Sequence, residues 1–286
     1  MVHINEVDSS TMNGCGFELC GLACRRCTLV RGFFPRRIES MRNLTPNFFI
    51  VVAIIFLLTA PGSSQEHREV TNRAGTGSAG KITVRLGSSS VVIPAPEGYE
   101  EATSQFERVK ARFSETEAPG NEMLAAHLMS SDCDLLRRNQ EATYQQYTKV
   151  SVLRTAKEQV FTQADLAAVV SEFRKNGTSM MDPDSPRMKA VLERVAQALK
   201  KPDLGMSQPV NMGEFEVSPN IYSVMLLMTY KSSSGAATPV LATMSYMRLQ
   251  QRLVYLFTYR QYTSRSDVEI LRSFAKTWTG KVLSAN

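Results

Sequence analysis

The sequence predicts an α+β fold in which a curved antiparallel sheet carries helices on both faces. Three observations support this fold class. Short β-branched runs open the folded part, amphipathic stretches with helical spacing occupy its middle, and strand-length runs with short connections follow Pro209. In Ile221–Tyr230 both alternating sets of side chains are largely apolar, which indicates a strand covered on both faces. We expect a single domain over residues 81–286.

An apolar segment at residues 41–64 precedes this domain. Phe48–Ala60 contains no charged residue, follows Arg42 and is followed by small residues up to Ser64. This order is typical of a secretory signal peptide, and the run is shorter than the roughly 20 apolar residues that span a bilayer. We expect cleavage near Ser64 and export to the periplasm. The alternative is an inner-membrane anchor, with membrane contact only through residues 48–60 and the C-terminal domain outside the cytoplasm.

The segments on either side of the apolar run are interpreted as follows. Residues 1–40 are either a mis-annotated extension, with Met41 as the true start, or a cytoplasmic tail. They contain Cys20-Gly-Leu-Ala-Cys24-Arg-Arg-Cys27, which looks like the iron–sulfur motif of radical SAM enzymes. An apolar segment follows instead of the alternating strands and helices of those enzymes, so we expect no cluster. Residues 65–80 are polar and rich in glycine, which indicates a flexible leader.

The first elements of the domain are a hairpin and a short helix. Ile82–Leu86 and Ser90–Ile93 are β-branched runs separated by Gly87-Ser-Ser, which predicts the hairpin. The proline-rich segment from Pro94 to Tyr99 ends the second strand. Apolar residues at helical spacing then predict a helix over 103–114.

Two further strands and two helices occupy the middle of the domain. Met123–Met129 and Tyr147–Leu153 are apolar runs of strand length, and Asp132–Gln140 between them reads as a polar connection. A capping pattern, Thr162 with Asp165, begins a helix that should end near Asn176-Gly177. A second helix begins at Ser185-Pro186 and ends near Lys200-Lys201-Pro202.

The last part of the domain is a meander closed by a helix. The expected strands are 209–217, Ile221–Tyr230, Val240–Arg248 and Leu253–Arg260. Their short connections favour antiparallel neighbours. The final helix starts at Ser266, with Glu269 three residues later as the partner in a capping box.

The order of these elements resembles that of the PsbP and DcrB-like families. The resemblance rests on a strand leading into a Pro-x-Gly-aromatic turn, here Pro96-Glu-Gly98-Tyr99, and on a final helix after the last strand. It covers about residues 81–284. The resemblance implies a curved antiparallel sheet with helices on both faces and an exported accessory role. It transfers no functional residue.

Few side chains in the domain suggest catalysis. His127, within an apolar strand, is expected to be a core or edge histidine, because zinc and dyad sites need several convergent groups. Cys133 lies between two aspartates, whose charges raise a thiol pKa. Four carboxylates that could form acid–base pairs are far apart in sequence and read as loop and edge charges: Asp182, Asp184, Glu214 and Glu216.

Cofactor and nucleic-acid binding are not predicted. The Gly75–Gly80 segment matches G-x-G-x-x-G, but a dinucleotide site needs a strand before it and a helix after it. We therefore expect no cofactor and no metal. The basic residues, which give a formal net charge of +6, are spread along the chain, which argues against nucleic acid as a partner.

The meander is dense in tyrosines, which cross-strand packing explains without a ligand. If the domain binds a ligand, we expect the contact near the strand ends, at five residues: Tyr246, Arg248, Tyr259, Arg260 and Tyr262.

These observations predict an exported, non-catalytic accessory or binding protein of the bacterial cell envelope, whose partner is an unknown protein or small molecule. Two alternatives stay open. One is a periplasmic hydrolase whose site assembles from distant residues, and the other is a membrane-anchored structural protein.

Overall fold

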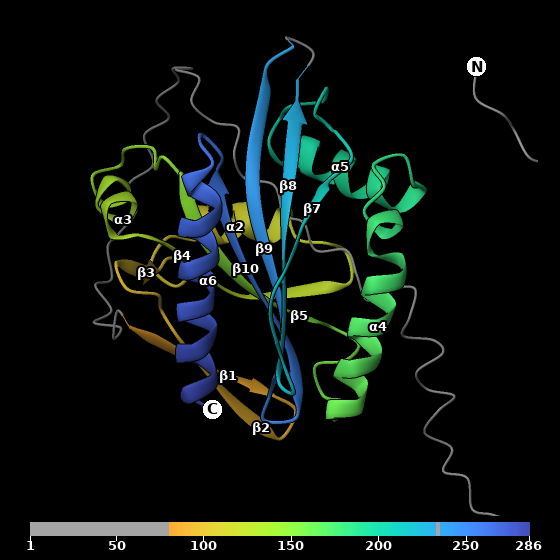
Figure 1. The fold of residues 1–286 in the computed structure, drawn as a ribbon. Coiled ribbons are helices and arrows are strands. Elements are labelled where there is room, and N and C mark those ends of the chain that lie inside the picture. The colour runs from red at the N-terminus through yellow and green to blue at the C-terminus, as the bar shows by residue number, and fades with distance from the viewer. Residues whose placement is uncertain (1–79, 233–234) are drawn as a thin grey trace, which may run out of the picture. The chain divides into compact units, whose positions relative to one another are not determined.

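The structure, a computed structural model, describes residues 80–232 and 235–286. Strands and helices are distributed along all of this part (Figure 1). The strands are β1 (Lys81–Leu86), β2 (Ser89–Pro94), β3 (Tyr99–Glu101), β4 (Asn121–Met129), β5 (Gln146–Leu153), β6 (Gly205–Met206), β7 (Val210–Ser218), β8 (Ile221–Lys231), β9 (Ala237–Leu249) and β10 (Arg252–Gln261). The helices are α2 (Glu107–Glu115), α3 (Ser130–Arg137), α4 (Gln163–Met180), α5 (Pro186–Ala198) and α6 (Ser266–Ser284).

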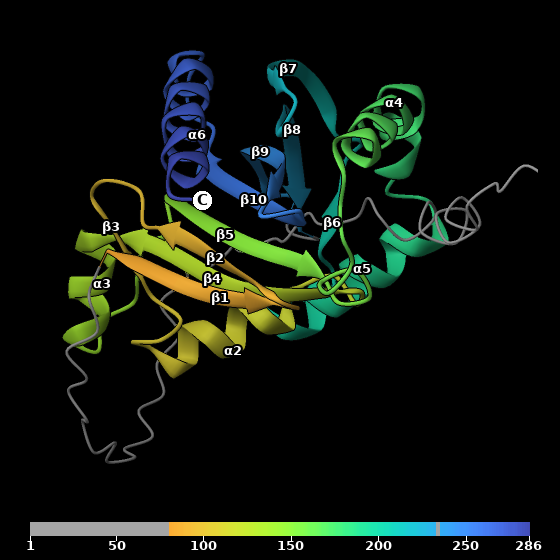
Figure 2. The same cartoon turned by 90° about the horizontal axis from the view of Figure 1, so that it is seen from below.

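Eight strands form one antiparallel sheet in the order β3-β4-β5-β10-β9-β8-β6, and β7 also pairs with β8. Helix α6 lies on one face, and α2, α4 and α5 lie on the other (Figure 2). Strand β8 is apolar on both faces, because Tyr222 and Val224 join the core on the side of α4 while Met225 packs against Leu271 of α6. The predicted fold class, an antiparallel sheet with helices on both faces, is confirmed.

The two faces of this sheet differ in the elements that cover them. The tyrosine face is the one covered by α2, α4 and α5, and it carries a continuous core of aromatic and aliphatic side chains. The α6 face is the opposite one, and α6 shares it with the β1–β2 hairpin. Because both faces are buried, both alternating sets of side chains along the central strands are largely apolar.

The β1–β2 hairpin is a separate two-stranded sheet that packs on the α6 face. The Nε1 of Trp278 donates to the carbonyl of Pro94 at 2.9 Å, and the side-chain amide of Asn286 bonds both backbone groups of Val92. Its turn has Gly87 at φ +60°, where a Cβ atom would lie 3.2 Å from the guanidinium of Arg252. The predicted hairpin is confirmed, and glycine is required at its turn.

Helix α3 corrects the prediction of a polar connection over 132–140. Asp132, Cys133 and Leu136 are buried along one side of a helix of eight residues. The polar composition concealed it, because one of its buried positions is a carboxylate that works as an internal hydrogen-bond acceptor. Strands β3 and β6 were also not predicted, since three and two residues are too few for an alternation to show.

The start of α4 is confirmed, and its end is not. Thr162 and Asp165 exchange hydrogen bonds of 2.7 and 3.2 Å, as a capping pair does. The helix continues past Asn176-Gly177 to Met180, because Gly177 is accommodated inside the helix against the ring of Phe173. A Cβ atom at Gly177 would lie 3.1 Å from that ring, so this glycine serves packing and does not end the helix.

Of the other two predicted helix caps, the one at α5 is confirmed and the one at α6 is not. Ser185 caps α5 as predicted, since its Oγ accepts the N–H of Met188 at 3.2 Å. The capping box of Ser266 with Glu269 is wrong. Glu269 pairs with Arg272, and the start of α6 is held by Asp267, whose carboxylate accepts the backbone N–H groups of the two residues Thr263 and Ser264.

The segments predicted before residue 80 lie outside the described residues. These are the extension or tail at 1–40, the apolar segment at 41–64 and most of the leader at 65–80. Among the helices of residues 80–232 and 235–286, each is too short or too polar to cross a bilayer.

Candidate functional site

His127 lies on the α6 face of β4 and is fully buried. Its Nδ1 is 2.9 Å from the hydroxyl of Thr148, and its ring meets Trp278 edge to face at a centroid distance of 5.6 Å. Burial lowers the pKa of His127 to about 4, although the charge of Glu101 opposes this shift. The imidazole is therefore neutral at physiological pH and belongs to the core, as the sequence predicts.

Cys133 is the free cysteine of the described residues and is fully buried in α3. Burial raises the pKa of its thiol to about 12, with a further contribution from Glu100. The two flanking aspartates act in the same direction, but burial has the larger effect. A thiol in this state is a weak nucleophile, since the thiolate is the reactive form.

A buried ion pair lies on the tyrosine face, at the centre of β5. Lys149 has no exposed side-chain surface, and its Nζ is 2.6 Å from Oε2 of Glu117, which is 3% exposed. Glu117 also accepts from Ser151 and Asn121, each at 3.1 Å. The ammonium lies 5.7 Å from the centroid of the Phe257 ring. The carboxylate of Glu117 thus has three partners. The ammonium of Lys149 contacts one carboxylate and lies near one aromatic ring.

This lysine–glutamate pair contains the residue types of a reactive site, but it is not accessible to a substrate. Burial lowers the pKa of Lys149, and the nearby Glu117 counteracts the shift. A lysine with a lowered pKa is the kind that serves as a general base or an amine nucleophile. Each member of the cluster is buried, so we assign the pair to the core.

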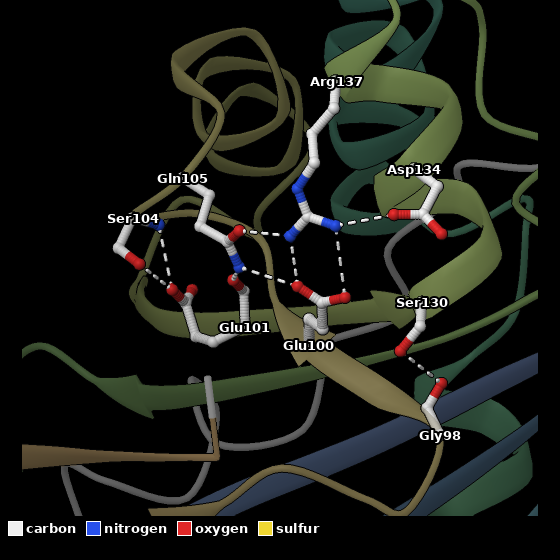
Figure 3. A network of polar contacts seen from close by, with 8 residues as sticks. All are labelled: Gly98, Glu100, Glu101, Ser104, Gln105, Ser130, Asp134 and Arg137. Atoms are coloured by element: carbon white, nitrogen blue, oxygen red, sulfur yellow. Dashed lines mark hydrogen bonds and ion pairs between the residues drawn. The ribbon is translucent and has the colours of Figure 1, made fainter. Parts of the chain in front are cut away.

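A polar network at the surface surrounds Arg137 at the end of α3 (Figure 3). Its guanidinium contacts both carboxylate oxygens of Glu100 on β3, Oδ1 of Asp134 at 2.8 Å and Oε1 of Gln105 at 2.8 Å. The hydrogen bond to Glu100 raises the pKa of Arg137. All four groups satisfy one another, and the network joins β3 to α3.

A second carboxylate in Figure 3 is buried and serves the chain locally. Glu101 accepts the backbone N–H of Thr103 at 2.8 Å and that of Ser104 at 3.0 Å, together with both of their hydroxyls. These bonds fix the turn that leads from β3 into α2. Asp132 has the same kind of role for the loop after α3, since it accepts the backbone N–H groups of Thr143 and Tyr144.

The five residues predicted to bind a ligand are not brought together. Tyr246 and Arg248 lie near one end of the β9–β10 pair, whereas Tyr259, Arg260 and Tyr262 lie near the other. Both Tyr246 and Tyr259 are 1% exposed within the tyrosine-face core. Ligand binding at these five residues stays a prediction.

The two arginines and the outermost tyrosine of that set have protein partners. Arg248 bonds the side chain of Asn220 at 2.7 and 3.0 Å. Arg260 lies between Asp267 and Gln146, each at 2.6 Å. Tyr262 packs beside α6. The tyrosines of the meander contact one another as expected. For example, the ring centroids of Tyr246 and Tyr255 are 5.5 Å apart.

The carboxylates considered as acid–base pairs each have another protein group as a partner. Glu214 binds Arg174 of α4 through two hydrogen bonds and accepts from the hydroxyl of Tyr222. The side chain of Glu216 lies on the α6 face and accepts from Thr279 at 2.8 Å. Asp182 accepts the backbone N–H of Asp184 in the turn before α5. Each reads as a structural group, as the sequence suggests.

Two pairs that matter most in this structure were not predicted. Lys149 and Glu117 are 32 positions apart, and Arg137 and Glu100 are 37 apart. One signal was available, because a lysine in the middle of an otherwise apolar strand such as Tyr147–Leu153 needs a buried partner. The sequence did not identify which carboxylate it was.

Comparisons with known proteins give a weak structural similarity and no function. No family model matches the sequence, and no curated protein matches it. The Saccharomyces cerevisiae Ran-binding protein Mog1p is similar at a TM-score of 0.32 and 12% identity, covering 73% of this chain and 93% of that one. A single-substitution mutant of Mog1 is similar at a TM-score of 0.31 and 11% identity, covering 72% and 92%. Similarity at this level assigns no role to any residue, and the α+β class rests on the strands and helices themselves.

Proposed function

We propose that the protein is a non-catalytic accessory or binding protein that acts outside the cytoplasm, at the cell envelope of a bacterium. The observation that carries this proposal is the state of its histidine and its cysteine. His127 and Cys133 are the only residues of these two types in the described part, and both are fully buried. Burial moves their pKa values to about 4 and about 12, away from the neutral range in which a general base or a thiolate works.

The position of the protein outside the cytoplasm is supported by the sequence before the domain. Phe48–Ala60 has the length of a signal-peptide core and follows Arg42. A mature chain beginning near Gln65 would retain the folded domain whole, because the first strand starts at Lys81. We further propose kinship with the PsbP and DcrB-like families, supported by the order of elements from β1 to α6 and by the turn at Pro96–Tyr99.

The alternative of a hydrolase has one observation in its favour, the shifted pKa of His127. A perturbed pKa marks functional sites when the group also lies in a cleft. His127 lies instead beneath Trp278 with no exposed surface, and Thr148 is its hydrogen-bond partner. The shift is the ordinary consequence of burial, so we prefer the binding role.

Location is tested by expressing the full-length chain with a C-terminal tag in a bacterium. We expect the protein in the periplasmic fraction, with a mature N-terminus near Gln65 by mass spectrometry. Ile54→Arg should retain the chain in the cytoplasm, and Ile54→Val should leave export unchanged. An intact wild-type chain in the cytoplasm would overturn the proposed location, and an intact chain in the membrane fraction would favour the anchored alternative.

The absence of catalysis is tested on the purified protein with ester, phosphoester, peptide and glycoside substrates. We expect no turnover above the blank. Turnover would establish an enzyme instead if it disappears in His127→Gln or Cys133→Ala while the variant keeps the urea unfolding midpoint of the wild type. Turnover that is equal in both variants and the wild type would point to a contaminant, which a catalytically silent second preparation would confirm.

A further inference from the structure

Helix α2 presents two arginines whose charge is not balanced by a carboxylate. Arg108 and Arg112 are four residues apart and therefore lie on the same side of the helix. None of the ion pairs formed within residues 80–232 and 235–286 includes either side chain. Two like charges at this spacing destabilise a helix slightly, so their position calls for a compensating anion.

Arg112 has the more unusual surroundings. The Cζ atom of its guanidinium lies 4.7 Å from the centroid of the Tyr144 ring, which orients the guanidinium by stacking. Its Nε and Nη2 are buried and have no hydrogen-bond partner. Leaving a buried donor without an acceptor is destabilising, and more so for a charged group. An oxyanion beside this half-buried guanidinium would supply the negative charge that it lacks.

Arg108 and Tyr144 are held in place by the backbone of the neighbouring loop. Arg108 Nη2 donates to the carbonyls of Leu136 at 3.3 Å and Gln140 at 3.1 Å, where α3 ends. Tyr144 is buried, and its backbone N–H is bound by Asp132. Burial raises the pKa of the Tyr144 phenol, and the charges of Arg112 and Arg108, with a hydrogen bond to Arg112, oppose this shift. The phenol thus lies within electrostatic reach of both guanidiniums.

Two exposed arginines of the domain, Arg137 and Arg174, provide a contrast. Arg174 also lies over a tyrosine ring, that of Tyr222 at 5.9 Å, but Glu214 satisfies its guanidinium through two hydrogen bonds. Arg137 lies 5.9 Å from the ring of Phe106 and is satisfied by Glu100 and its neighbours. Arg112 has the ring without the carboxylate. Among these three stacked arginines, it is the one that lacks an anionic partner.

We propose that Arg108 and Arg112 form a binding site for a phosphate group on the surface of α2. The site has two guanidiniums, which suit the several oxygens of a doubly charged tetrahedral anion better than the two oxygens of a single carboxylate. This inference rests on the proposed binding role and names the chemistry of its ligand. The phosphate can belong to a soluble phosphate ester or to a lipid headgroup, and the test separates the two.

The test uses the full-length protein, with inorganic phosphate as the first probe. Titration is followed by calorimetry and by the NMR signal of the Arg112 side-chain Nε–H. We expect saturable binding, with a shift of that signal and a dissociation constant on the order of 1 mM or tighter, as suits a small ligand with few contacts. Arg112→Gln and Arg108→Gln should each weaken binding about tenfold or more. Arg112→Lys, which keeps the charge but loses the planar fork, should recover only part of it.

Arg174→Gln is the matched control, because it removes one charge from another arginine that lies over a tyrosine. Its phosphate affinity should stay within about twofold of the wild type. Equal weakening in Arg174→Gln and Arg112→Gln would show a general charge effect and overturn the site. No saturable binding by the wild type would overturn it as well. Arg108→Gln lies at an exposed position and keeps the test informative if Arg112→Gln does not fold.

The source of the phosphate is separated with two further probes, glycerol 3-phosphate and vesicles of phosphatidylcholine with a fraction of phosphatidic acid. Binding to the soluble ester alone indicates a soluble ligand, and stronger binding to the vesicles that Arg112→Gln abolishes indicates a headgroup. Failure of phosphate binding leaves the non-catalytic role standing, since that role is tested by turnover. Turnover of a phosphate ester would instead overturn the non-catalytic role while supporting the phosphate site.

Discussion

The two faces of the main sheet bury polar groups in different ways. The tyrosine face buries a full ion pair, Lys149 with Glu117, among aromatic side chains. The α6 face buries neutral hydroxyl pairs such as Thr243 with Thr258, the contact of Thr148 with His127, and one carboxylate, Asp267, whose partner Arg260 is partly exposed. Both faces therefore contain polar groups at zero or near-zero exposure, but among the ion pairs of the described residues only the one on the tyrosine face has both of its members buried.

The difference predicts where the protein is sensitive. A buried ion pair depends on both partners, because removal of one leaves an uncompensated charge in the core. A neutral hydroxyl pair loses only a hydrogen bond, which contributes about 1 kcal/mol. The histidine of the α6 face lies between these cases, since it is neutral near pH 7 and acquires its charge in acid. Changes on the two faces should accordingly differ in size and in pH dependence.

The largest effect is expected from Glu117→Gln on the tyrosine face. The amide keeps the shape but removes the charge, which leaves Lys149 buried without its counter-ion and should destabilise the fold by about 3–5 kcal/mol. Urea unfolding at pH 7 measures the change. Glu122→Gln is the matched control, because Glu122 pairs with Lys157 at a side-chain exposure of 40% and 37% and should lose less than about 1 kcal/mol.

The double variant Glu117→Gln with Lys149→Met separates charge from packing. Since it removes both charges, it should recover much of the stability lost in Glu117→Gln alone. Equal loss in the single and double variants would show that the carboxylate acts through Asn121 and Ser151, to which it is hydrogen-bonded, and not through the lysine.

The second effect concerns acid sensitivity of the α6 face. Because the pKa of His127 is about 4 in the folded protein and about 6.5 in the unfolded chain, the unfolded state binds a proton first as the pH falls. The contribution of His127 is complete above about pH 6.5 and is lost progressively down to about pH 4. Its size is about 3 kcal/mol, from the difference between the two pKa values.

Unfolding free energies measured between pH 7.5 and pH 4 in the wild type and in His127→Gln test this expectation. Glutamine can keep a hydrogen bond to Thr148 but does not titrate, so the slope between pH 6.5 and pH 5 should be smaller in the variant. The lower part of the range also contains carboxylates, which titrate in both proteins and cancel in the comparison. Identical slopes in the two proteins would contradict a buried neutral imidazole.

The comparison of faces also explains how much the sequence could predict. Two-sided burial of β8, the hairpin and the start of α4 were readable, because each depends on neighbours within a few residues. The capping of α6 was misread because three polar residues compete at its start. Asp267, and not the predicted pair of Ser266 with Glu269, binds the backbone there, through the N–H groups of Thr263 and Ser264. Local sequence patterns predict the helices and strands. Which of several neighbouring polar side chains caps a helix depends on the three-dimensional geometry.

The candidate phosphate site and the ion pair depend on contacts between distant residues. Arg112 meets Tyr144 only because α3 and the loop after it fold back beside α2, and α3 was itself hidden by its polar composition. Lys149 was visible as an anomaly in an apolar strand, but its partner lies in the loop after α2. The sequence therefore marks some of the residues that need partners without naming the partners, which is why the predicted binding residues of the meander did not form one cluster.

The smallest effect is expected from Thr258→Val on the α6 face. Valine has the shape of threonine without its hydroxyl, so the variant leaves the Thr243 hydroxyl buried without this partner and should cost about 1–2 kcal/mol in the free energy of unfolding. Thr243→Val with Thr258→Val removes both hydroxyls and should be less destabilising than the sum of the single changes, because no polar group is then stranded. Additive losses in this cycle would mean that the two hydroxyls are independent. The contrast between neutral pairs on the α6 face and a charge pair on the tyrosine face would then no longer hold.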